Sequence, residues 1–135
     1  MGRIQWTSEQ REIIKARGSN ILVSAAAGSG KTAVLIERIY QRIMDKSEPV
    51  DVDQFLVVTF TKAAAAQMKD RLRERLEQAL SERPEDLHLQ RQVQLMGAAH
   101  ISTVHSFCGY VIQNYFHRIG MDPSYRQGTE SELAL

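Results

Sequence analysis

A lysine and a threonine follow two glycines within a run of small residues, an order that suits phosphate binding. Residues 25–32 read Ala-Ala-Ala-Gly-Ser-Gly-Lys-Thr and fit the phosphate-loop pattern G-x-x-x-x-G-K-[ST] except at its first position. The glycines allow the backbone to turn so that successive N–H groups point at phosphate oxygens. We expect Lys31 to reach the β and γ phosphates of ATP and Thr32 to offer its hydroxyl to Mg²⁺, which makes these two the candidate catalytic residues. The predicted ATP-binding residues of this loop are Ala25, Ala26, Ala27, Gly28, Ser29, Gly30, Lys31 and Thr32.

Ala25 stands where the pattern has its first glycine. An alanine does not adopt left-handed backbone angles as readily as glycine does, so this position must turn differently. The alternative interpretation is an ordinary small-residue turn with a solvated lysine. An apolar strand predicted before the loop and an amphipathic helix predicted after it favour phosphate binding.

Gln10 is a candidate for recognising the base of the nucleotide. Its side chain carries a donor and an acceptor side by side, which can pair with adenine N6 and N7. The alternative is that Gln10 only completes a capping box with Thr7, three residues before it, at the start of a helix.

Thr59, Phe60, Thr61 and Lys62 lie where a predicted strand meets a predicted helix. An aromatic ring at a strand tip offers nucleic-acid bases a stacking surface worth about 1–3 kcal/mol per base. Hydroxyl groups and the helix N-terminus behind them suit phosphate oxygens. The alternative is that Phe60 belongs to the core and that the basic residues of the following helix form a solvated face.

A second segment of this kind contains Thr103, His105 and Ser106. The two hydroxyl groups can donate to phosphates, and the imidazole can donate or stack. For His105 the alternative is a capping or core histidine. Both segments predict contacts with single-stranded DNA.

The elements that position these residues follow from hydrophobic periodicity. We predict strands over residues 21–23, 55–60 and 100–104, and helices over residues 8–17, 62–81 and 84–97 and from residues 31 and 104 onward. Residues 129–132 resemble the start of one more helix. Strands that alternate with helices predict an α/β fold with a parallel sheet covered on both faces.

Each long helix has a predicted apolar side. After the phosphate loop this side is Val34, Leu35, Ile39 and Ile43, opposite a solvated face of Glu37, Arg38, Gln41 and Arg42. In the next long helix it is Ala65, Met68, Leu72, Leu76 and Ala79. In the last helix it is Val104, Phe107, Cys108, Val111, Ile112, Tyr115 and Phe116, and we expect Cys108 and Phe107 to be buried there.

Composition narrows the class of protein. Of the 135 residues 43% are hydrophobic, which suits a packed core. The net charge is 17 − 16 = +1, so a nucleic-acid site must come from a local patch. A single cysteine excludes a disulfide framework. No apolar run approaches the length of a membrane span, so we expect a soluble, cytoplasmic protein.

Taken in order, these motifs resemble those of superfamily 1 helicases of the UvrD/Rep type. The alanine-led loop, Gln10 upstream of it, the Thr59–Ala65 segment and the Ser102–Phe107 segment all match that pattern. The resemblance implies a P-loop, RecA-like fold, in which Gln10 binds adenine. It also implies DNA contacts by Thr59, Phe60, Thr61, Lys62, Thr103, His105 and Ser106.

Details of the motifs indicate a subfamily. Only Lys62 precedes the paired alanines, a short form similar to the AddA and RecB helicase–nucleases, with AddA the nearer. Gln67 departs from the glutamate common there. The resemblance implies a bacterial 3′-to-5′ helicase–nuclease acting in double-strand-break repair and recombination, with an AddB-type partner.

ATP hydrolysis also needs carboxylates for Mg²⁺ and for water. No apolar strand followed by an Asp-Glu pair occurs in residues 104–135. We therefore expect residues 1–135 to be an N-terminal fragment of a helicase ATP-binding domain, truncated before the Walker B strand and inactive alone. A Rep- or RecB-like parent and an unrelated P-loop kinase or transport ATPase remain alternatives.

Overall fold

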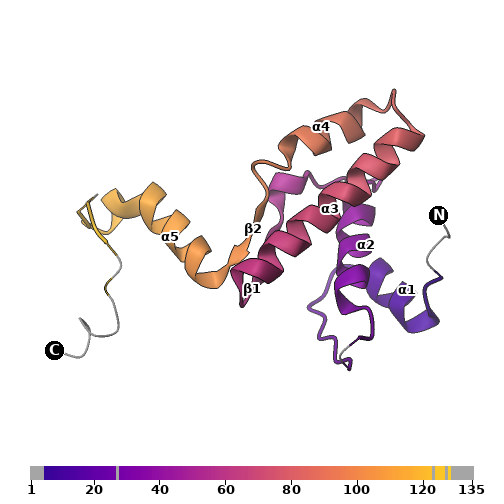
Figure 1. The fold of residues 1–135 in the computed structure, drawn as a ribbon, viewed down its shortest axis with the longest axis horizontal. Helices are drawn as coiled ribbons and strands as arrows, with labels where there is room; N and C mark the ends of the chain where they lie inside the picture. Colours follow the sequence, from indigo (N-terminus) through magenta and orange to yellow (C-terminus); the bar gives the residue numbers. More distant parts are fainter. Residues whose placement is uncertain (1–4, 27, 123, 127, 129–135) are drawn as a thin grey trace.

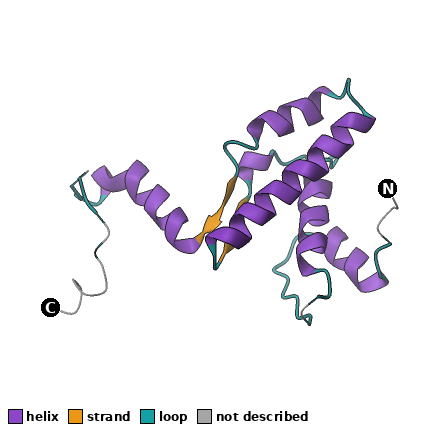
Figure 2. Cartoon of the chain, viewed as in Figure 1, coloured by secondary structure: helices purple, strands orange, loops and turns teal. Residues whose placement is uncertain are grey.

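The computed structural model describes residues 5–26, 28–122, 124–126 and 128 (Figure 1). The chain forms helix α1 (Ser8–Lys15), helix α2 (Lys31–Ile43), the short helix η1 (Val52–Gln54), strand β1 (Leu56–Thr59) and helix α3 (Lys62–Glu82). Then follow α4 (Leu87–Leu95), β2 (His100–Thr103), α5 (Val104–Tyr115) and the short helix η2 (Phe116–Arg118). The fold is α/β, as the sequence predicted, with much more helix than strand (Figure 2).

The two strands form a small parallel sheet. Leu56 pairs with His100 at one end, and Thr59 pairs with Thr103 at the other. Helices α3 and α4 make the crossover between the strands, and α3 packs on both of them. Because the strands are parallel, α3 and α5 leave the sheet at the same edge (Figure 1).

The core lies between α2, α3, α4 and the inner face of the sheet. All five apolar residues predicted for α3 are buried, and Leu72 and Leu76 are enclosed at 1% and 0% exposure. On α2, three of the four predicted residues are buried, whereas Leu35 is 37% exposed. The 3.6-residue period of these helices therefore predicted their buried faces well.

Two groups of predicted solvated side chains on α2 and α3 in fact join the helices. Glu37 forms an ion pair with Arg75 at 3.1 Å. The guanidinium of Arg75 also lies 3.7 Å from the ring centroid of Tyr40, a cation–π distance. The helix that follows the phosphate loop is thus fixed directly to the helix that follows β1.

The prediction of a buried strand over residues 21–23 is wrong for this structure. The segment has no strand pairing, and Leu22 is 96% exposed. An apolar run becomes a buried parallel strand only where neighbouring strands pair with it on the sheet. Here β1 and β2 pair with each other, and Leu56 and Val58 on β1 likewise stay exposed at 51% and 47%.

The prediction of a buried face on the last helix is also wrong. Residues 104–115 do form α5, but the helix has no buried residue, and Cys108 is exposed. Phe107 is only half-buried, with its ring edge-on to His100. The reason is geometric, because α5 extends away from the rest of the chain and contacts only the strands near its start (Figure 1).

Smaller differences concern element ends. Helix α1 ends at Lys15, two residues early, and α4 begins after its N-cap Asp86 instead of at Pro84. The helix start predicted over residues 129–132 lies outside the described residues. Among the helices that the structure describes, none has the length and apolar character needed to cross a membrane.

Candidate nucleotide-binding loop and DNA-facing edge

The loop before α2 turns at its glycines. Gly28 has φ 78° and Gly30 has φ 83°, both in the left-handed region that glycine adopts readily. No described residue other than glycine has a positive φ, so Ala25 does not need the angles of the glycine it replaces. Ala27, also predicted to bind phosphate, lies outside the described residues.

The N-terminus of α2 lacks a capping side chain. Its N-cap is Gly30, which makes no side-chain hydrogen bond. The other four α-helices described here are capped by Thr7, Thr61, Asp86 and Thr103. The first amides of α2 therefore have neither an intrahelical partner nor a cap, and they lie at the positive end of the helix dipole. Such an end is suited to an anion.

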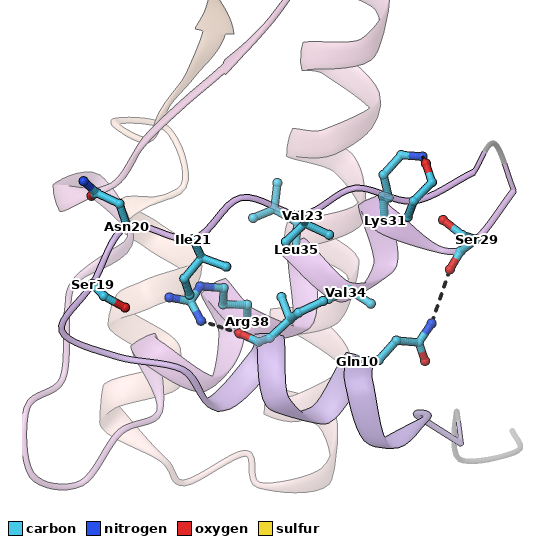
Figure 3. A pocket seen from close by; sticks show the side chains of 12 residues that line it. Gln10, Ser19, Asn20, Ile21, Val23, Ser29, Lys31, Val34, Leu35 and Arg38 are labelled. Carbon is cyan, nitrogen blue, oxygen red and sulfur yellow. Dashed lines mark hydrogen bonds between the residues drawn. The ribbon is translucent and has the colours of Figure 1, made fainter.

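Lys31 folds back over this loop. Its ammonium group donates hydrogen bonds to the carbonyl oxygens of Ala25 and Ala26, the second at 2.8 Å (Figure 3). An ammonium group has three donors, so one of them is not used by these two contacts. The lysine side chain is exposed, which leaves the charge close to the loop amides and accessible to a ligand.

Thr32 is half-buried in the first turn of α2, which holds no acidic residue. Within the part of the chain that the structure describes, no group of three or more His, Cys, Asp or Glu side chains could hold a metal ion. The hydroxyl of Thr32 alone is a weak ligand for Mg²⁺, which prefers several oxygens in octahedral geometry. The donor set therefore fits an ion that arrives with phosphate oxygens.

Gln10 takes part in two contacts that bear on its predicted role. The backbone N–H of Thr7 donates to Gln10 Oε1 at 3.0 Å, and the backbone N–H of Gln10 donates to Thr7 Oγ1 at 3.2 Å, so the predicted capping box is present. Gln10 Nε2 also donates to the carbonyl oxygen of Ser29 at 3.3 Å (Figure 3). An amide has two N–H donors and two acceptor lone pairs, so these contacts leave one of each for a base.

A cavity of about 450 Å³ lies beneath the loop, between α1, α2 and the segment over residues 19–25 (Figure 3). Gln10, Ser29 and Lys31 line one side of it. Its apolar lining consists of Ile13, Ile21, Val23, Ala25, Val34 and Leu35. Gln10 and the phosphate loop thus border one hollow, although they belong to different elements.

The two predicted DNA segments lie side by side. Thr59 and Thr103 are paired across the sheet, so the residues that follow them leave the same edge. Phe60 is fully exposed at 101%, which excludes the core alternative for its ring. Lys62 and His105 are exposed as well.

The hydroxyl groups of these segments are used mainly within the fold. Thr61 Oγ1 accepts from the backbone N–H of Ala64 at 3.1 Å and caps α3. Thr103 Oγ1 caps α5 by accepting from the backbone N–H of Ser106 at 3.1 Å, and Thr103 is only 7% exposed. The hydroxyl of Thr59 donates to the carbonyl oxygen of Thr61 at 2.9 Å. These threonines therefore fix the strand-to-helix turns that present Phe60, Lys62 and His105.

Sequence comparison identifies the family that these features belong to. Residues 6–134 match the UvrD/REP helicase N-terminal domain. The chain belongs to the UvrD/REP helicase family. The helicase resemblance inferred from the motifs is thereby confirmed. The structure of this UvrD/REP-family chain adds how the loop, Gln10 and the DNA-facing edge are arranged.

The similar proteins share one name, that of the A-type component of an ATP-dependent helicase/nuclease. The relative from Pelotomaculum thermopropionicum is 59% identical over 130 residues, which cover 96% of this chain and 10% of that protein. The relative from Anoxybacillus flavithermus is 57% identical over 97% of this chain, and the relative from Clostridioides difficile is 51% identical over all of it. The AddA resemblance inferred from the motifs is confirmed, and this UvrD/REP-family chain spans about a tenth of the length of these relatives.

Proposed function

We propose that this chain is the ATP-binding part of the N-terminal helicase domain of an ATP-dependent DNA helicase–nuclease. The observation that carries the proposal is the uncapped start of α2, which follows the Gly28 and Gly30 turns and holds Lys31 at the loop. The family match and the name shared by the relatives support the same function.

ATP binding would exchange the partners of Lys31. In the structure its ammonium group contacts neutral carbonyl oxygens of its own loop. Phosphate oxygens are charged, and hydrogen bonds that involve ionised groups are roughly twice as strong as neutral ones. A triphosphate would therefore draw the lysine away from Ala25 and Ala26 while the first amides of α2 bind the same phosphates. Mg²⁺ bound by the phosphates would take the hydroxyl of Thr32 as a further ligand.

Adenine recognition would use the unoccupied half of the Gln10 amide. The capping box already fixes the rotamer of this side chain through Thr7. A preorganised amide loses little entropy when it pairs with a base. A bidentate pair of this kind is worth about 1–3 kcal/mol of discrimination between bases.

Single-stranded DNA would contact the edge where β1 and β2 end. The fully exposed ring of Phe60 is suited to stacking with a base, and Lys62 and His105 flank it with donors. Thr61 and Thr103 would act through the helix starts that they cap, and their remaining capacity, with Thr59 and Ser106, would serve phosphate oxygens.

The parent protein would act as a 3′-to-5′ helicase and nuclease in double-strand-break repair and recombination, together with an AddB-type partner. The support for polarity, pathway and partner is the motif resemblance and the name that the relatives share. The short motif with Lys62 alone before the alanines favours this parent over a Rep-like one.

ATP binding is the direct test. Isothermal titration of the chain with ATP and Mg²⁺ should give a saturable site, and Lys31→Ala should remove most of the affinity. Lys46→Ala, an exposed lysine in the loop after α2, is the matched control and should bind as the original chain does. Equal affinity of the Lys31→Ala chain would refute the proposed function.

A further inference from the structure

The C-terminal end of α1 is bound by an arginine that belongs to α2. The Nη1 group of Arg38 donates to the carbonyl oxygens of Ile13, Ile14 and Ala16, the last at 2.7 Å. The last carbonyls of a helix have no intrahelical partner and carry the negative end of its dipole. Arg17 adds hydrogen bonds from the chain just after the helix, to Ile14 at 2.8 Å and Ala16 at 3.0 Å.

This contact joins the two elements that carry the proposed nucleotide site. Helix α1 holds Gln10, and α2 begins with Lys31. The segment between them passes through exposed residues 17–26 without strand pairing, so it gives α1 little support. The described polar contacts between α1 and the loop–α2 unit are therefore at its two ends, from Gln10 to Ser29 and from Arg38 to the last carbonyls.

The chemistry of Arg38 suits a fixed attachment. Its side chain is half-buried, and Ile14, whose carbonyl it contacts in α1, is 2% exposed. A guanidinium group has a rigid planar fork, so several carbonyls can bind it only when they keep one arrangement. Burial, and then the nearby charges of Arg17 and Arg42, lower the pKa of Arg38. The hydrogen bonds from α1 thus hold a cation in surroundings that otherwise disfavour it.

We propose that Arg38 is a positioning residue for base selection, because it fixes α1 on α2 and thereby holds Gln10 at the height where its amide can discriminate adenine from guanine. This inference rests on the proposed function. Adenine offers an N6 donor where guanine offers an O6 acceptor, and both have N7. Selection therefore depends on how Gln10 is placed, whereas phosphate binding depends on the start of α2.

The test separates base selection from phosphate affinity. Dissociation constants for ATP, GTP and inorganic triphosphate are measured by titration calorimetry for the original chain and for Arg38→Met, Arg38→Lys and Gln10→Ala. Arg42→Met is the matched control, because Arg42 lies one turn further along α2 and its side chain has no described contact with α1. We expect Arg38→Met to lower the ATP-to-GTP preference about tenfold, as Gln10→Ala does, with triphosphate affinity unchanged. Arg38→Lys should lie between, and Arg42→Met should keep the preference.

A second measurement needs no nucleotide. Trp6 is the single tryptophan, and it lies four positions before Gln10, in a groove lined by α2 and α3. Release of α1 should make its fluorescence more accessible to acrylamide in Arg38→Met than in Arg42→Met. Unchanged quenching in Arg38→Met would contradict the positioning role directly.

Each outcome decides one level of the argument. If Arg38→Met weakens ATP, GTP and triphosphate by the same factor, Arg38 is merely structural and the inference fails. The inference also fails if the original chain binds ATP and GTP equally, although its phosphate site would stand. If the original chain binds no triphosphate, the proposed function itself fails. Should Arg38→Met unfold, the same comparisons with Arg38→Lys decide the question.

Discussion

Replacing Gly30 with alanine tests whether the loop geometry is a strained, built feature. Gly30 has φ 83°, and an added Cβ would meet only Gln10 Nε2, at 3.5 Å, an ordinary contact distance. The cost is therefore conformational and not steric. Left-handed angles cost a residue with a side chain about 1–2 kcal/mol. Loss of glycine's freedom in the unfolded chain offsets about 0.4–1 kcal/mol of that.

The expected net loss for Gly30→Ala is about 1 kcal/mol, or a fall in Tm of about 3–5 °C for a chain of this size. Gly97→Ala is the control, because that glycine has no positive φ and no atom within 4 Å of an added Cβ. Thermal unfolding followed by circular dichroism measures both. If Gly30→Ala is as stable as the original chain, or if Gly97→Ala loses as much, the backbone argument is refuted.

Three further predictions concern the core, the DNA-facing edge and acid stability. Leu76→Ala, at a fully buried position, should lower the free energy of unfolding in urea by about 2–5 kcal/mol, whereas Leu87→Ala, 77% exposed, should change it little. Phe60→Ala should weaken single-stranded DNA binding by about 1–3 kcal/mol in fluorescence anisotropy and leave Tm unchanged. An unrelated P-loop kinase would show no DNA effect. Hydrogen bonds from Ser47 lower the pKa of Asp45 below its usual 3.8, so stability from Asp45 is present above about pH 3.8 and lost as the pH falls through the lower folded value. Asp45→Asn should remove that part of the acid dependence, and an NMR titration of Asp45 at or above its usual pKa would contradict it.

The sequence predicted those features that depend on local pattern. The buried residues of α3 follow one stripe, from Ala65 to Ala79, because helix period and burial agree along its whole length. The Thr7 and Gln10 capping box was predicted for the same reason, since four adjacent residues suffice to form it. The glycine turns of the phosphate loop likewise depend only on the residues within it.

Features that depend on distant partners could not be predicted in this way. Residues 21–23 have the composition of a buried strand, but burial requires strands on either side, and none pairs there in the described structure. Cys108 lies on an apolar helix side that no described element covers. Arg38 looked like one solvated arginine among several, because its partners are carbonyls 22 to 25 residues away. Backbone acceptors leave no trace in side-chain patterns.

The account depends most on the claim that the loop amides and Lys31 bind a triphosphate. A crystal structure with a non-hydrolysable ATP analogue and Mg²⁺ tests it most directly. We predict that the phosphates accept hydrogen bonds from the first amides of α2, and that the ammonium group of Lys31 leaves Ala25 and Ala26 for a phosphate oxygen. A nucleotide bound elsewhere, with the lysine still on those carbonyls, would contradict the account.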